Sequence, residues 1–142
     1  MSNRVRTQLS VKNPYYIEPE RMLELRHFVH QYGSWKRWVK DYNFKYGTVF
    51  YSGIGRDQNV HKPVEEEVER RDRFVSSIDM VDETLYEAFN EMTNGIRNYI
   101  LEAITGNKSY EWLRTMHNVP FGKDYYFRRY RKFFWLLDKA RK

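Results

Sequence analysis

The chain has 142 residues, with 25 Lys and Arg against 19 Asp and Glu and a formal net charge of +6. Aromatic residues make up 18% of the chain, which is enough to build a core despite a mean hydropathy of −0.86. Cysteine is absent, which excludes disulfides, cysteine-ligated zinc, iron–sulfur clusters and thiol catalysis. The apolar runs are short, so neither a membrane span nor a secretory signal is expected.

The excess positive charge is concentrated at the C-terminal end. Residues 121–142 contain eight basic and two acidic side chains, whereas residues 12–120 contain 15 basic and 17 acidic ones. Such a segment is typical of a surface that binds a polyanion, although a basic helix facing solvent has the same composition.

The spacing of apolar residues predicts an all-α fold of about five to seven helices. Residues 1–17 are expected to form an arm. The first predicted helix covers about 19–32 and ends at Gly33, and Ser34 caps a second helix. The second helix presents Trp35, Trp38, Val39 and Tyr42 on one face. Three glycines interrupt residues 44–61, which we predict to be a loop or a short hairpin.

A third helix is predicted to start at Pro63, with its glutamates mostly on a solvated face. Its inner stripe is expected to consist of Val64, Val68, Arg71, Val75 and Ile78. The helical pattern continues from Met80 to Met92, either in the same helix or as a fourth one. A further pattern covers 96–104 and ends at Gly106. The expected division places an arm, two helices and a loop in residues 1–61. Residues 62–142 then form a helical region ending in a helix-turn-helix, the whole making one compact unit.

The last part of the chain predicts a pair of helices. Ser109 caps a short helix over about 109–117, residues 118–122 form a turn, and a long helix covers about 123–140. This order fits a helix-turn-helix, in which the second helix enters the major groove of DNA. Ordinary helix packing produces the same pattern. An amphipathic helix lying on an acidic membrane is the other alternative, which the preceding helix disfavours because it offers a protein partner for the apolar face.

The long helix is expected to turn an aromatic face inward and a basic face outward. The inward residues are Phe127, Tyr130, Phe133, Phe134 and Leu137, and Tyr125, Arg128, Arg129 and Lys132 share the opposite face. The candidate DNA-binding residues are Lys123, Tyr125, Arg128, Arg129, Arg131 and Lys132. Arginine can read guanine in the major groove, so Arg128 and Arg129 are expected to contact bases or phosphates. The other four residues are expected to position the helix on the phosphate backbone.

Several stretches carry a resemblance to a known group of proteins. They are Asn13–Ile17, Arg97–Thr105, Ser109–Leu113 and Val119–Leu137. The chain resembles the RinA/ArpU-type regulators of late genes in phages and prophages of Gram-positive bacteria, whose C-terminal half is similar to the helix-turn-helix of sigma-factor region 4. The resemblance implies an all-α DNA-binding protein that acts at a promoter in the bacterial cytoplasm. Ser109–His117 would be its supporting helix, and the recognition helix would begin at Lys123.

Two other classes of function remain open. A small-terminase-like packaging protein would bind DNA as a closed ring. A phage-encoded inhibitor of a host protein or defence complex would use exposed aromatic residues (Tyr15, Tyr16, Trp35 and Trp38) or the segment 47–60 as its interface. RNA polymerase or another host protein is a candidate partner of the regulator, which is expected to be a monomer or homodimer.

Catalytic and cofactor motifs are not evident in the sequence. Glu24, His27 and His30 share a helix turn but have no convincing further ligand, so a metal site is not expected. The chain is therefore expected to be a binding protein without a cofactor, rather than an enzyme.

Overall fold

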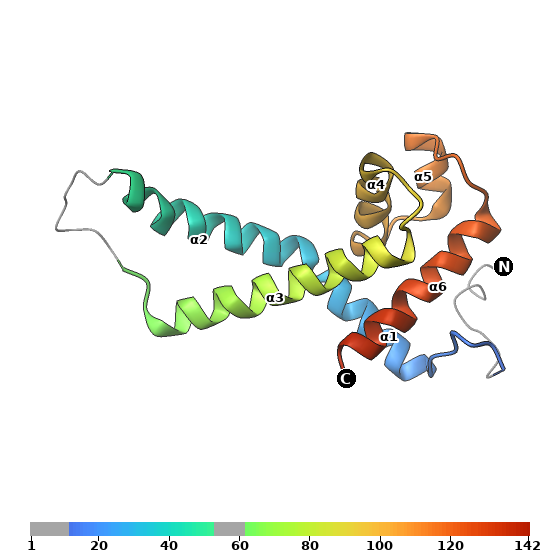
Figure 1. The fold of residues 1–142 in the computed structure, drawn as a ribbon, viewed down its shortest axis with the longest axis horizontal. Coiled ribbons are helices and arrows are strands. Elements are labelled where there is room, and N and C mark those ends of the chain that lie inside the picture. The colour runs from blue at the N-terminus through green and yellow to red at the C-terminus, as the bar shows by residue number, and fades with distance from the viewer. Residues whose placement is uncertain (1–11, 53–61) are drawn as a thin grey trace. The chain divides into compact units, whose positions relative to one another are not determined.

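The computed structural model describes residues 12–52 and 62–142, and in these ranges it contains six α-helices and no strand (Figure 1). The all-α prediction is therefore confirmed. The helices are α1 (Pro19–His30), α2 (Tyr32–Ser52), α3 (Glu65–Ala88), α4 (Asn94–Thr105), α5 (Tyr110–His117) and α6 (Lys123–Ala140). Within the described ranges, none of them combines the length and apolar character that a membrane span requires.

The chain divides into two compact units. The first, here the core unit, comprises the chain up to Gln31 together with Met80–Lys142. The second, here the hairpin, comprises Tyr32–Asp79. Helix α3 contributes to both, because it continues without interruption across the boundary at Asp79 and Met80.

In the hairpin, α2 and the first part of α3 run antiparallel (Figure 1). Aromatic side chains connect the two helices. The ring of Phe74 lies 6.3 Å from that of Trp35 and 5.5 Å from that of Trp38. The guanidinium of Arg70 lies 5.8 Å from the centre of the Trp38 ring. Further along, the hydroxyl of Tyr46 donates a hydrogen bond of 2.7 Å to the carboxylate of Glu67. The row of α3 that faces α2 therefore includes Glu67, Arg70 and Phe74.

This packing corrects the predicted inner stripe of α3. Val64 is 58% exposed and Val68 is 36% exposed, although both were expected to face inward. The reason is that α2 presents tyrosine and tryptophan rings, which bind a carboxylate and a guanidinium as well as an apolar ring. A pattern of apolar residues alone does not reveal such polar contacts.

Two predicted helix boundaries in this region are also wrong. The break after α1 falls at Gln31, so Gly33 and Ser34 lie in the first turn of α2. Ser34 Oγ accepts a hydrogen bond from the Arg37 guanidinium there instead of serving as the predicted cap. Helix α2 also continues through Gly47 to Ser52, where a loop or hairpin was expected. One glycine inside a helix costs only about 1 kcal/mol, which the packing of Trp38, Tyr42 and Tyr46 outweighs. The rest of that predicted loop, residues 53–61, lies outside the described part of the chain.

The contact between Tyr46 and Glu67 makes the hairpin sensitive to acid. The Tyr46 hydroxyl and the Val64 amide hold the pKa of Glu67 below its ordinary value of 4.5. A lowered folded-state pKa contributes stability above the ordinary value, and this contribution is lost as pH falls through the folded-state pKa. In Tyr46→Phe the pKa of Glu67 should rise toward 4.5, as measured by an NMR titration of its carboxyl carbon. Tyr42→Phe keeps both partners and should leave the titration unchanged. An unchanged titration in Tyr46→Phe would show that the hydrogen bond is not formed.

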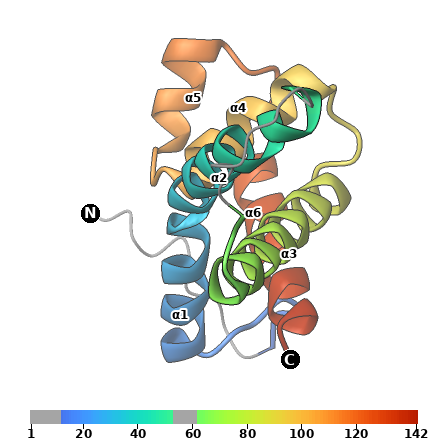
Figure 2. The same cartoon turned by 90° about the vertical axis from the view of Figure 1, so that its left-hand side faces the viewer.

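In the core unit, α1 packs against α4 and α6, and α4 packs against α5 (Figures 1 and 2). Met22, Leu25 and Val29 form the buried stripe of α1 at the spacing expected for a helix. A polar contact also joins α1 to the last part of α6. The Arg21 guanidinium donates a 2.6 Å hydrogen bond to Asp138 near the end of α6. Interhelix contacts thus hold α6 along its length and fix the face it presents.

The connection between α3 and α4 is built around Arg97. Helix α3 continues to Ala88, so the helical pattern that continues from Met80 is its last part and not a fourth helix. Thr93 caps α4, and the Arg97 side chain donates to the carbonyl oxygens of Phe89 and Met92. These contacts satisfy backbone acceptors that a helix end leaves without partners. The tight connection sets the position of Glu91, whose carboxylate accepts hydrogen bonds from two residues of α6.

Candidate nucleic-acid interface

Helix α5 and the following turn have the boundaries that the sequence predicts. Ser109 caps α5, because its hydroxyl accepts a hydrogen bond of 3.0 Å from the Trp112 amide. The helix ends at His117 and is capped by Asn118, whose backbone is left-handed with φ 48° and ψ 51°. Asparagine tolerates this conformation better than most residues, so it suits a sharp exit from a helix. The turn then leads to Gly122, which precedes α6.

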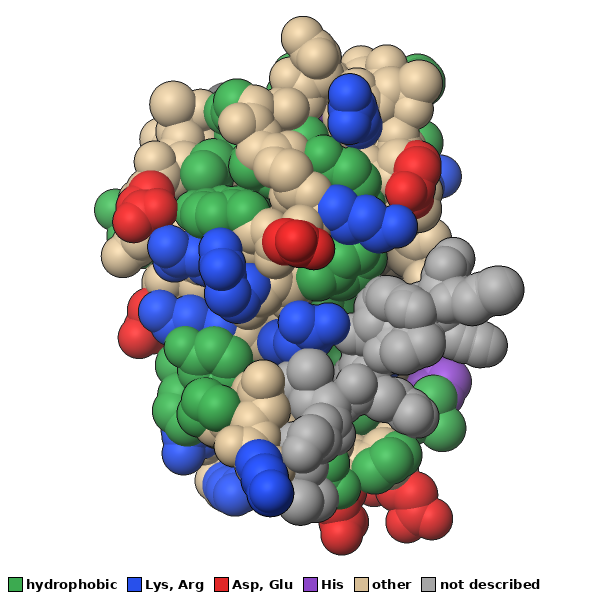
Figure 3. Space-filling view, turned by 90° about the vertical axis from the view of Figure 1, so that its right-hand side faces the viewer, with side chains coloured by type: hydrophobic (Ala, Val, Ile, Leu, Met, Phe, Trp, Pro, Cys, Tyr) green, Lys and Arg blue, Asp and Glu red, His purple; other side chains and the backbone are tan. Residues whose placement is uncertain are grey.

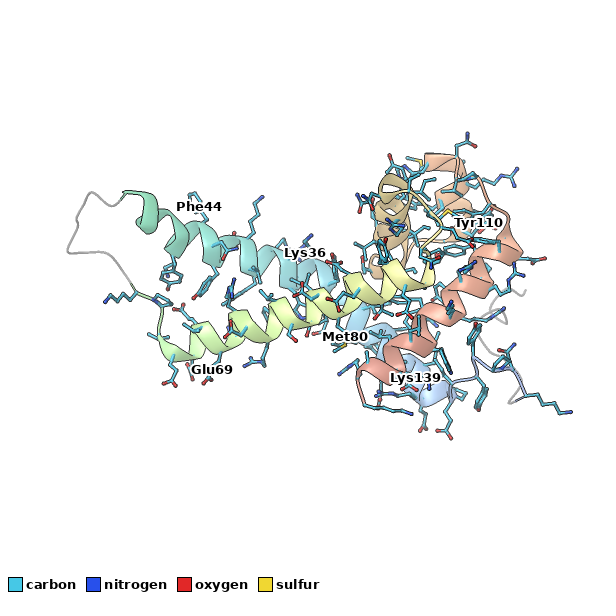
Figure 4. The ribbon with its side chains drawn as sticks, in the orientation of Figure 1. Lys36, Phe44, Glu69, Met80, Tyr110 and Lys139 are labelled. Carbon is cyan, nitrogen blue, oxygen red and sulfur yellow. The ribbon has the colours of Figure 1, made fainter. Side chains whose placement is uncertain are left out.

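Tyr110 fixes the turn between the two helices. Its hydroxyl donates a 2.7 Å hydrogen bond to the carbonyl of Phe121, and its side chain lies between α5 and the start of α6 (Figure 4). The Phe121 ring is nearly parallel to that of Tyr126, with an interplanar angle of 5° and centroids 6.1 Å apart. A buried hydroxyl with a backbone partner and stacked rings restricts the turn to one geometry. The angle between α5 and α6 is therefore set by specific contacts.

The inner face of α6 is aromatic, as expected, but it is rotated from the predicted one. Phe133, Phe134 and Leu137 are fully buried, whereas Phe127 and Tyr130 are partly exposed. Tyr126 lies outside the predicted stripe, although the run of aromatic residues 125–127 is more typical of a core than of a base-stacking surface, and it is 2% exposed. Burial raises the pKa of Tyr126 strongly, so it stays neutral in the core. The sequence signal for Tyr126 was weak because it stands in a run of three consecutive aromatic residues.

The rotation turns two of the predicted DNA-binding residues toward the end of α3. The guanidinium of Arg129 donates to the carbonyl of Ala88 at 3.3 Å and to the carboxylate of Glu91 at 3.1 Å. The hydroxyl of Tyr125 donates to the same Glu91 carboxylate at 3.0 Å. Burial and the Glu91 contact raise the pKa of Tyr125. Tyr125 and Arg129 therefore brace α6 against α3 and do not lie with Arg128 at the centre of the outer face.

The remaining predicted residues lie toward solvent. Arg128 is exposed, with its guanidinium 5.9 Å from the Tyr125 ring. Lys132, one turn further along, and Arg131 are half-exposed. Lys123, in the first turn, is 3.5 Å from Glu111 of α5, and both side chains are at least half-exposed. Because exposed ion pairs contribute little energy, Lys123 can exchange this partner for a phosphate at small cost.

The last turns of α6 use their charges within the molecule. The Lys139 ammonium lies 4.3 Å from the Trp135 ring, and the Arg141 guanidinium lies 3.8 Å from the Phe28 ring. Lys142 is 3.8 Å from Asp138. The ring of Tyr15 lies 5.4 Å from that of Trp135. Lys139, Arg141 and Lys142 are nevertheless exposed, so cations face solvent near both ends of α6.

Figure 3 shows the side of the molecule on which α5 and the start of α6 lie in Figure 1. Lys and Arg side chains form several groups on this face, with acidic and apolar side chains between them. Asp124, exposed in the first turn of α6, is one acidic residue of this region. A mixed surface of this kind suits a small number of defined contacts better than a uniform attraction to any polyanion.

The aromatic residues assigned to the alternative protein-binding surface are used in packing. Trp35 is 5% exposed, and Trp38 is half-exposed and stacks on Tyr42. Tyr15 and Tyr16 are also only partly exposed. The expectation that these four residues form an exposed interface is therefore not supported by their positions. Of the segment 47–60, residues 47–52 are helical and the rest lies outside the described ranges.

Comparisons with models of known protein families, with curated proteins and with solved structures found no significant match. The similarity to late-gene regulators remains a prediction.

Proposed function

We propose that the chain binds duplex DNA sequence-specifically through α5, its turn and α6, as a phage-type transcriptional regulator in the bacterial cytoplasm. The observation that carries this proposal is the arrangement of the first half of α6. Lys123, Arg128 and Lys132 point toward solvent on a helix whose opposite face is buried. In a helix-turn-helix, the N-terminal part of the second helix contacts base edges while the first helix supports it.

The residues of α6 have different roles in this proposal. Arg128 reads a base or binds a phosphate, because its guanidinium is exposed and can form two parallel hydrogen bonds. Lys123, Arg131 and Lys132 bind phosphates and set the register. Asp124 stabilises the positive end of the helix dipole, and its carboxylate can accept a hydrogen bond from a cytosine amino group. Tyr125 and Arg129 hold the helix at the correct angle.

The test is a selection of bound sequences from a pool of random DNA duplexes, followed by titration of the enriched duplex at about 50 and 200 mM salt. We expect one motif to be enriched and its affinity to fall steeply with salt. In Arg128→Ala/Lys132→Ala, affinity for that motif should fall more than about tenfold. The slope of log affinity against log salt should decrease by about 2 if both residues contact phosphates.

Lys139→Ala/Lys142→Ala is the matched control, since it removes two positive charges from the other end of the same segment. Its affinity for the motif should stay close to that of the wild type. Failure to enrich any motif would refute sequence-specific binding. Equal losses in the two double variants would mean that only total charge matters.

A further inference from the structure

The side of α3 next to its α2-facing row carries a regular apolar pattern that the DNA-binding proposal does not use. The spacing between successive members alternates between four and three residues, which is the heptad pattern of packed helices. They are Val64, which immediately precedes α3, and Val68, Arg71, Val75 and Ile78 within it; these four apolar residues and one arginine are here called the valine seam. Val64 and Val68 are exposed, and Val75 and Ile78 are half-exposed. Apolar side chains that recur at this spacing can be covered by a partner helix.

The two rows that flank the valine seam differ. On one side lie Glu67 and Phe74, seven residues apart, which contact α2 through Tyr46 and the tryptophans. On the other side lie Glu65, Asp72 and Asp79, also seven residues apart and all exposed. The outer border of the seam is therefore uniformly acidic.

The other helix of the hairpin has the opposite charge. Between Tyr32 and Gly47, α2 carries four exposed cations and one exposed anion. The cations are Lys36, Arg37, Lys40 and Lys45, and the anion is Asp41. Lys36 and Lys40 are one turn apart, so they form a basic edge on this helix. The hairpin thus contains both a seam with an acidic border and a helix whose charge complements it.

We infer that the valine seam binds the hairpin of a second copy of this chain, forming a two-fold symmetric four-helix bundle. In this dimer, α2 of each copy lies along the acidic border of the other copy's α3. Lys36 and Lys40 then meet Asp72 and Asp79 of the second copy, twice by symmetry. Arg71 places one polar group within the seam, held by Asp72 at 3.2 Å, and such a residue fixes the register of packed helices. The inference does not depend on DNA binding.

The test is sedimentation equilibrium of the full chain over a wide range of concentrations. The wild type should sediment with twice the mass of the 17.5 kDa chain. In Val64→Glu/Val68→Glu, dimer affinity should fall at least about tenfold, since the bundle would bury unpaired carboxylates. Phe44→Glu is the matched control, because Phe44 is 75% exposed on the side of α2 away from α3 (Figure 4). This variant should remain dimeric.

Charge reversal tests the pairing of edges with every residue of the valine seam kept, although Asp72→Lys also removes the partner of Arg71. Lys36→Glu/Lys40→Glu and Asp72→Lys/Asp79→Lys should each weaken the dimer, and the combination of all four should restore it. These exposed substitutions also keep the inference testable if the seam variant does not fold. A wild type that stays monomeric at the highest concentration would overturn the inference. A dimer that survives the seam substitutions would also overturn it, as would a quadruple variant without restored affinity.

Discussion

Replacing Phe134 by Ala should lower the free energy of unfolding of the core unit by about 3–5 kcal/mol. Phe134 is 1% exposed and lies within 5.0 Å, centroid to centroid, of the rings of Phe133 and Tyr130. Truncation removes the whole buried ring and leaves a cavity that the surrounding aromatic residues cannot fill without leaving their packed positions. Urea denaturation followed by circular dichroism measures the loss.

Two further variants make this result interpretable. Phe44→Ala truncates the same side chain where it is 75% exposed, and its stability should stay within about 0.5 kcal/mol of the wild type. Phe134→Leu keeps most of the volume and should cost less than about 1.5 kcal/mol, so it gives a value if the alanine variant is unfolded. A near-neutral Phe134→Ala would mean that α6 is rotated differently, and the assignment of its outer face would then be wrong.

The two adjacent arginines of α6, Arg128 and Arg129, should differ in how much their substitution lowers the free energy of unfolding. Arg129→Ala should lower stability by about 1–2 kcal/mol, because the carbonyl of Ala88 and the carboxylate of Glu91 lose a donor. The ion pair contributes only the smaller part, since Glu91 is 62% exposed. Arg128→Ala should leave stability within about 0.5 kcal/mol, because the Arg128 side chain lies in solvent.

The affinity for DNA should also distinguish Arg128 from Arg129, in the reverse order. At a temperature where both variants are folded, Arg128→Ala should weaken binding of the selected duplex more than Arg129→Ala. Thermal unfolding and a titration of the labelled duplex provide the two measurements. If Arg129→Ala leaves stability unchanged and weakens binding as much as Arg128→Ala, then Arg129 contacts DNA and does not brace the helix.

The C-terminal helices could be predicted from the sequence because their boundaries depend on local chemistry. Ser109 supplies its own cap hydrogen bond, and Gly122 and the residues before it end one helix and start the next within a few positions. Local rules of this kind do not require knowledge of distant contacts. The same applies to the end of α4 at Gly106.

The rotation of α6 could not be predicted in the same way. Tyr125 and Arg129 turn toward Glu91, which precedes them by more than 30 residues and is positioned by the Arg97 connection. Their direction is thus decided by a partner that no local pattern indicates. For α3, Tyr46 and Trp38 of α2 decide which row of side chains faces α2, because they contact Glu67 and Arg70. In both helices the sequence predicted the existence of the element but not the face that binds its neighbour.

The continuity of α3 across the two units has a consequence for local unfolding. Its residues up to Asp79 belong to the hairpin, and those from Met80 to Ala88 belong to the core unit. Cooperative opening usually follows packed units rather than single helices. The first half of α3 can therefore lose its hydrogen bonds together with α2 while Val81, Leu85 and Ala88 remain buried. The two parts of one continuous helix would then differ in the free energy of local unfolding. The boundary between them would lie within regular helical backbone.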